Sequence, residues 1–113
     1  MRQGARSDQA LDTSKDRRPY LVISGDSWNL EPRYPRITLC PLTGAERVLR
    51  RFDTDVLLRA RETGLPKDSV VRCVEIYTTF RDVLIGPAGR ISDAKLRDVE
   101  RALGLYLSLL SVS

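Results

Sequence analysis

The chain has 113 residues, of which 42% are hydrophobic and 30% charged, and it carries a net charge of +4. This composition suits one small soluble domain, and no run approaches the roughly 20 apolar residues that a membrane-spanning helix needs. The N-terminus lacks the apolar core of a signal peptide, so we expect a cytoplasmic protein. Histidine is absent, which excludes His-based general-base catalysis and most zinc sites, and we expect neither a metal nor a cofactor.

Residues 1–16 are polar and predict a mobile N-terminal arm, followed by one folded domain over 17–113. β-branched and aromatic residues predict strands over 20–23, 36–43, 52–59, 69–79 and 84–85. Turn residues separate these runs, and 29–35 contains two prolines and is predicted as a loop. Cys40 and Cys73 lie in apolar runs, which favours reduced, buried thiols over the alternative of a bridge between neighbouring strands.

The chain ends in a predicted amphipathic helix. Ser92 is the expected N-cap, and Asp93 in the first turn suits the helix dipole. Apolar residues then recur at spacings of three and four and are predicted to face the core: Leu96, Val99, Leu103, Leu107 and Leu110. Strands followed by one helix predict an α+β fold, in which a small antiparallel sheet or partly open barrel carries a C-terminal helix.

The positive charge is concentrated in one segment. Residues 17–51 hold seven arginines against three acids, whereas the rest of the chain is balanced at twelve of each sign. Sixteen of the nineteen cations are arginines, whose planar guanidinium suits bidentate contact with phosphate. The segment therefore indicates an anionic partner.

Several short motifs, in this order along the chain, resemble those of MazF/PemK-type toxins. They are Arg18-Pro19 before the apolar strand 20–23, Ser24-x-Asp26-x-x-Asn29, Pro41-Leu42-Thr43, the turn and strand TGLPKDSVV at 63–71, and Gly89-Arg90-Ile91-Ser92 before the helix. Residues 70–73 also resemble the matching segment of Kid-like members. The likeness covers about residues 17–110.

The resemblance implies an SH3-like barrel of the MazF/CcdB type and a toxin of a type II toxin–antitoxin system. It implies a metal-independent endoribonuclease (mRNA interferase) for single-stranded RNA. In such enzymes the 2′-hydroxyl attacks the adjacent phosphate and leaves 2′,3′-cyclic phosphate and 5′-hydroxyl ends. The implied partners are RNA, a cognate antitoxin and a second copy of the chain.

The family's site positions carry over to Arg18, as the cation on the scissile phosphate, and to Thr43, whose hydroxyl can bond the phosphate or the attacking group. Arg72 is a Kid-like third candidate. The hypothesis requires Arg18 and Thr43 to converge on one pocket from separate strands. We also expect RNA contacts in the basic segment, where the aromatic rings could stack on bases: Arg17, Trp28, Arg33, Tyr34 and Arg47.

The chain departs from the family pattern at two places. Residues 5–11, ARSDQAL, lack the apolar alternation of the family's opening strand. Val74 stands where members often carry an acid, so Glu75 would have to replace it as the base, from the opposite face of a strand. An alternative interpretation makes Arg72 and Glu75 a cross-strand ion pair.

Two other functions remain open at this point. One is a CcdB-like toxin that binds DNA gyrase without catalysis, and the other is a degenerate member that binds RNA or antitoxin.

Overall fold

The computed structural model describes residues 10–13 and 18–110. Over these residues the strands are β1 (Ala10–Thr13), β2 (Pro19–Val22), β3 (Arg36–Gly44), β4 (Asp55–Leu58), β5 (Ser69–Arg72), β6 (Tyr77–Phe80) and β7 (Leu84–Gly89). The helices are α1 (Asp26–Asn29), α2 (Ala60–Thr63) and α3 (Asp93–Tyr106), and the short 3-10 turns are η1 (Ala45–Arg47) and η2 (Arg81–Val83).

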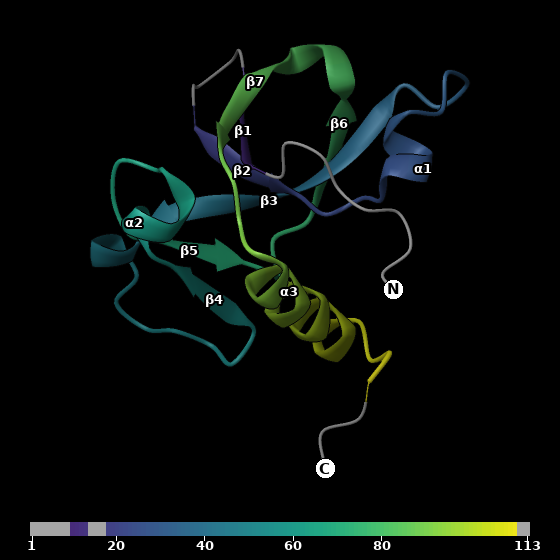
Figure 1. Ribbon diagram of the computed structural model, residues 1–113. Coiled ribbons are helices and arrows are strands. Elements are labelled where there is room, and N and C mark those ends of the chain that lie inside the picture. Colours follow the sequence, from purple (N-terminus) through teal and green to yellow (C-terminus); the bar gives the residue numbers. More distant parts are fainter. Residues whose placement is uncertain (1–9, 14–17, 111–113) are drawn as a thin grey trace.

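The strands form an antiparallel sheet in the order β4-β5-β3-β2-β1-β7, and β6 also pairs with β3. β3 is the longest strand and runs from α1 at one end to α2 at the other, with α3 packed near β4 and β5 (Figure 1). The sheet is not closed into a complete barrel. This arrangement confirms the α+β prediction of an antiparallel sheet with a C-terminal helix.

β1 corrects the predicted N-terminal arm at residues 10–13. The strand pairs with β2 on one side and with β7 on the other, so it belongs to the sheet. A strand of four residues with one large apolar side chain gives no periodic signal, and its conformation is set by the two strands that flank it. The remainder of the predicted arm, at 1–9 and 14–16, lies outside the described residues.

The single strand predicted over 69–79 is two strands, β5 and β6. Both strands pair with β3. Leu42 of β3 pairs with Val71 of β5, and Leu39 of β3 pairs with Tyr77 of β6. Five residues, 72–76, therefore lie opposite two residues of β3, and a turn at this place lets the chain move from one ladder to the next.

Pro41 of β3 lies between these two ladders, where no residue of β5 or β6 pairs with it. A proline in a strand is usually found at an edge or a bulge, because it has no N–H to donate. The structure instead places it in a central strand, at the point where the neighbour of that strand changes.

Two apolar clusters lie on the two faces of the β2–β3 pair. Leu21 and Cys40 belong to the larger cluster, which is completed by buried residues of α3, including Leu96 and Val99. The smaller cluster consists of Val22, Ile37 and Leu39. Because side chains alternate along a strand, each residue of β2 and β3 can be assigned to the face of one cluster or the other.

The C-terminal helix begins as the sequence predicts, since the Ser92 hydroxyl accepts a hydrogen bond from the Lys95 N–H. It ends earlier than the leucine pattern suggests. Helix α3 stops at Tyr106, and Leu107 and Leu110 lie beyond it with about half of their surface exposed (51% and 46%), so the prediction that they are core is wrong.

A left-handed residue follows the end of the helix, since Ser108 has a φ of 60°. The N–H groups of Leu109 and Leu110 both donate to the Gly104 carbonyl, so the chain folds back over the last turn of the helix. The Leu110 side chain packs where a Cβ at Gly104 would lie, 2.7 Å from its Cδ1. Within residues 10–13 and 18–110, no helix is both long and apolar enough to span a membrane.

Candidate functional site

Arg18 and Thr43 lie on adjacent strands of the sheet. β2 pairs with β3 through Tyr20–Pro41, Leu21–Cys40 and Val22–Leu39. The observed ladder ends at Tyr20–Pro41, and two residues further in the same register the corresponding positions are Arg18 and Thr43. Directly opposite residues project to the same face of an antiparallel pair, so both side chains point to the face of the smaller cluster. Arg18 is exposed and Thr43 is half-buried at the end of β3.

Arg72 lies on the same face one strand further along. β5 pairs Val70 with Thr43, and Arg72 follows two residues later, which makes it the diagonal neighbour of Thr43. Diagonal neighbours have Cα atoms about 7 to 8 Å apart, within reach of a long side chain. Three adjacent strands therefore carry Arg18, Thr43 and Arg72 toward one face of the sheet, with the Arg72 side chain directed to β4 by its contact with Asp55.

The Arg72 side chain is held by β4 and the loop before it. Its Nε donates to Asp55 Oδ1 at 3.0 Å, and its guanidinium lies 5.8 Å from the centre of the Phe52 ring. The Asp55 side chain is completely buried and that of Arg72 is 19% exposed. The alternative Arg72–Glu75 ion pair is therefore wrong, because the acid that pairs with Arg72 is Asp55.

Glu75 lies in the turn between β5 and β6, and its N–H donates to the Arg72 carbonyl at 2.9 Å. It is exposed and belongs to neither strand. The prediction that a strand would turn it to the opposite face therefore does not apply, since strand alternation is interrupted at this turn.

Trp28 and Tyr34 form one aromatic pair at the other end of β3. Their rings meet edge to face, with centroids 5.8 Å apart, and they line a shallow pocket together with Ser24 and Thr38. Thr38 and Thr43 are five residues apart on β3, which corresponds to about 16 Å, and their side chains point to opposite faces. The structure thus separates the aromatic pair from Arg18 and Thr43.

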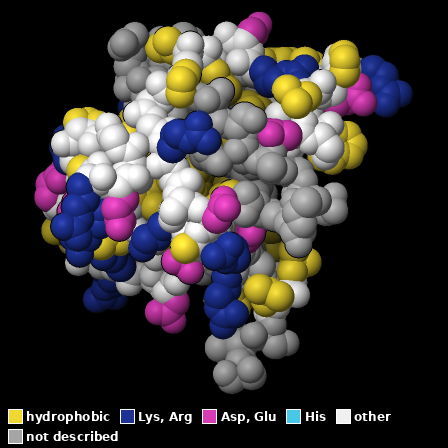
Figure 2. Space-filling view, viewed as in Figure 1, with side chains coloured by type: hydrophobic (Ala, Val, Ile, Leu, Met, Phe, Trp, Pro, Cys, Tyr) yellow, Lys and Arg dark blue, Asp and Glu magenta, His cyan; other side chains and the backbone are white. Residues whose placement is uncertain are grey.

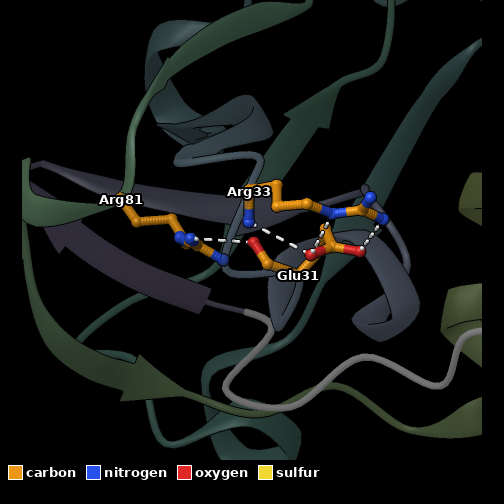
Figure 3. Close-up of polar contacts among 3 residues, drawn as sticks. All are labelled: Glu31, Arg33 and Arg81. Atoms are coloured by element: carbon orange, nitrogen blue, oxygen red, sulfur yellow. Dashed lines mark hydrogen bonds and ion pairs between the residues drawn. The ribbon is translucent and has the colours of Figure 1, made fainter.

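The loop that carries these rings is held by Arg81, which comes from η2. Its guanidinium donates to the carbonyls of Asn29 and Glu31, and its own N–H donates to the Pro35 carbonyl at 2.9 Å. Figure 3 shows Arg81 reaching the Glu31 backbone. Both ends of the loop are therefore fixed by one residue that is about 50 positions away in the sequence.

Arg33, the predicted RNA contact in this loop, pairs with Glu31 through Nε and Nη2, at 3.2 and 3.0 Å (Figure 3). This hydrogen bonding holds the pKa of the Glu31 carboxyl below its ordinary value of 4.5. The Arg33 side chain is still 89% exposed, so it remains accessible from solvent.

The other predicted basic contacts are not gathered at one place. Arg47 is exposed in η1, near the Thr43 end of β3, and Arg17 lies outside the described residues. Figure 2 shows Lys and Arg side chains interspersed with Asp and Glu on the side of the molecule that carries α2. In the described part of the chain, no group of three or more His, Cys, Asp or Glu residues could hold a metal ion.

Comparison with known proteins identifies the family. The family model for the "PemK-like, MazF-like toxin of type II toxin-antitoxin system" matches residues 6–107. The chain belongs to the PemK/MazF toxin family.

Curated relatives and solved structures agree with this assignment. The chain is 33% identical to a Mycobacterium tuberculosis protein named Endoribonuclease MazF9, over 98% of this chain and 99% of that one. The structure of the Mycobacterium tuberculosis toxin MazF-mt6 matches with a TM-score of 0.74 at 23% identity, over 88% of this chain and 96% of that one. An endoribonuclease from a mycobacterial species, solved in complex with its cognate antitoxin, matches with a TM-score of 0.72 at 21% identity, over 92% and 93% of the two chains.

Within this PemK/MazF fold, Asp55 and Arg81 are two polar residues that the sequence-based reasoning missed. Asp55 gives a weak signal in retrospect, because a carboxylate at the start of an apolar strand requires a partner when it is buried. Arg81 gives none, since its acceptors are backbone carbonyls far away in the sequence.

Proposed function

We propose that the chain is a metal-independent endoribonuclease that cuts single-stranded RNA and acts as the toxin of a type II toxin–antitoxin pair. The observation that supports the proposal is the register of β2 on β3, because its extension by two residues corresponds to Arg18 and Thr43 on one face. The curated relatives named as MazF endoribonucleases support the same activity.

The chemistry makes modest demands on the enzyme because the nucleophile belongs to the substrate. The 2′-oxygen of the ribose loses its proton and bonds to the adjacent phosphorus, the bond from phosphorus to the 5′-oxygen breaks, and that oxygen takes up a proton. The products are a 2′,3′-cyclic phosphate and a 5′-hydroxyl. The enzyme must align these atoms and stabilise the negative charge that develops on the phosphoryl oxygens.

Arg18 is the proposed electrostatic residue. An arginine side chain is a permanent cation, so Arg18 acts through its charge and not as a proton carrier. The Thr43 hydroxyl donates to a phosphoryl oxygen or orients the 2′-hydroxyl. Arg72 supplies a second cation from the diagonal position, and Glu75 is the carboxylate that we propose as general base, from an exposed turn that a substrate can reach.

RNA flanking the cleaved bond is proposed to contact Trp28, Arg33, Tyr34, Arg17 and Arg47. The two aromatic rings would stack on unpaired bases, which is a sequence-tolerant contact. Because they lie about 16 Å along β3 from Thr43 and toward the other face, the RNA would have to pass around the edge of the sheet to reach them.

We propose that the toxin works in the cytoplasm as a homodimer neutralised by a cognate antitoxin. The antitoxin would lay an extended or helical peptide along a groove of the dimer. Structures of relatives in complex with antitoxin support this partner.

The test is to incubate the purified protein with a long RNA in EDTA and to map the new ends. We expect cleavage with cyclic phosphate and 5′-hydroxyl termini, and loss of cleavage in Arg18→Ala. Arg97→Ala, on the exposed side of α3, is the matched control and should cleave like the wild type. A folded Arg18→Ala protein that still cuts RNA would remove Arg18 from the mechanism.

The same assay separates the rival functions. Binding to gyrase without RNA cleavage would support the CcdB-like function, and salt-sensitive RNA binding without product would support a degenerate member. The motif residues Arg18 and Thr43 are both present in this chain, which favours the ribonuclease.

A further inference from the structure

Asp55 is a fully buried carboxylate at the start of β4, beside the candidate site. Its Oδ2 accepts the Phe52 N–H at 2.9 Å, and its Oδ1 accepts Arg72 Nε at 3.0 Å. Each carboxylate oxygen thus has a donor, which satisfies a group that would otherwise be strongly unfavourable in the interior.

This contact engages Arg72 through one nitrogen. A bidentate pair would have used both Nε and a terminal Nη, but the second oxygen of Asp55 is taken by the Phe52 backbone. Within the described residues the two Nη groups of Arg72 make no hydrogen bond, so four of its five N–H donors remain for another acceptor.

The strand order places Arg72 on β5, between β4 and β3. Arg72 pairs directly with Asp55 across β5 and β4, and it is diagonal to Thr43 across β5 and β3. The contacts with Asp55 and with the Phe52 ring restrict the rotation of the Arg72 side chain. Less conformational entropy is therefore lost when this side chain binds a phosphate.

We propose that Asp55 is a positioning residue that holds the Arg72 guanidinium ready for the phosphate of the RNA. The inference rests on the proposed ribonuclease function, in which Arg72 is the second cation. Asp55 itself touches no reacting atom. Its effect is to fix the direction of the guanidinium, and a cation displaced by about 1 Å from the productive position can lower a rate by about 100-fold.

A second ion pair in the chain provides a matched control. Asp68 also accepts one backbone N–H, from Ala60 at 2.8 Å, and one guanidinium nitrogen, from Arg59 at 3.1 Å. It differs in that its side chain is 41% exposed and in that it lies in the loop between α2 and β5, with no contact to Arg72. Asp68→Asn therefore makes the same chemical change without touching Arg72.

The experiment measures kcat and KM for RNA cleavage in Asp55→Asn and Asp68→Asn, at a temperature where both proteins are folded. We expect Asp55→Asn to lower kcat by about 10- to 100-fold. Its KM should stay unchanged or fall, because removing a negative charge near the site does not weaken RNA binding. Asp68→Asn should keep both constants close to the wild type. A role of Asp55 in stability alone would leave kcat of the folded variant unchanged, and that result would overturn the proposal.

Arg72→Gln completes the test. In this background Asp55→Asn should add little further loss, because the two residues act through one group. If Asp55→Asn does not fold, the apolar double variant Asp55→Leu/Arg72→Met replaces it, since exchanging a buried ion pair for apolar residues is often tolerated. That protein should be folded and slow, and a wild-type rate would refute the inference.

Failure of the inference can be told apart from failure of the proposed function. A wild-type protein that cuts no RNA contradicts the function itself, and the role of Asp55 falls with it. A wild-type protein that cuts RNA, together with Arg72→Gln at full kcat, contradicts only the role of Arg72 and Asp55.

Discussion

The two cysteine thiols should be almost unreactive in the folded protein. Cys40 and Cys73 are both fully buried in the larger cluster beneath α3, and both are free thiols. Desolvation raises the pKa of each thiol from 9.0 to about 12. Since the thiolate is the reactive form, a rise of this size lowers its population near neutral pH by about 1000-fold.

The assay is alkylation with iodoacetamide at pH 8, followed by mass spectrometry, on the native protein and on the protein in denaturant. We expect two labels in denaturant without any reductant and a native rate at least about 1000-fold slower, limited by opening of the core. Labelling of the native thiols at a rate close to the denatured one would refute the packing of α3 on the sheet. Labelling that requires a reductant would instead reveal a bridge.

The same pKa shifts set the response of the protein to alkali. A thiol whose pKa is higher in the folded chain contributes fully to stability below pH 9.0, and this contribution is lost as the pH rises toward about 12. The free energy of unfolding should fall by about 1.4 kcal/mol per pH unit for each thiol in this range. Replacing both cysteines by alanine should flatten the alkaline slope, and an unchanged slope would contradict the assignment.

The remaining predictions concern the candidate site, the core, the loop held by Arg81 and the stability of the protein at low pH. Thr43→Val keeps the β-branched shape and removes only the hydroxyl, so RNA cleavage should fall by about 100- to 1000-fold while the melting temperature changes little; full activity would exclude the hydroxyl. Leu96→Ala, at a position only 1% exposed, should lower the free energy of unfolding by about 2 to 5 kcal/mol in urea titrations, and a loss well below this would mean that α3 packs loosely. Arg81→Met removes the hydrogen bonds to the backbone of the loop 29–35, so this loop should become more mobile and the fluorescence anisotropy of the single tryptophan should fall. An unchanged anisotropy would show that the loop is held without Arg81. The pKa of Asp68 is lowered from 3.8, chiefly because the Ala60 N–H donates to its carboxylate. The stability that this group contributes above pH 3.8 should therefore disappear on further acidification. The free energies of unfolding of Asp68→Asn and of the wild type should converge at low pH.

The elements with a strong local signal were predictable from the sequence. Helix α3 follows from the Ser92 cap and from Leu96 and Val99 at helical spacing, and both cues are local. β3 and β4 follow from their β-branched and apolar residues. The family likeness follows from short motifs that lie in the right order, and it led to Arg18 and Thr43 before any register was known.

Other features depended on neighbours that are distant in the chain. β1 has little signal of its own and exists because β2 and β7 flank it. The run 69–79 is continuous in sequence, but the change of ladder along β3 divides it and moves Glu75 out of any strand. The partner of Arg72 could not be read locally, since Asp55 precedes it by 17 positions.

The amino-acid sequence alone was enough to predict the C-terminal helix, the strands with a strong apolar signal and the family that the chain resembles. These properties depend on side-chain propensity and periodicity, which act over a few residues. Which side chains share a face, and which acid pairs with which cation, followed only from the folded arrangement. Strand register fixes those relations, and register depends on pairing between segments that the sequence keeps apart.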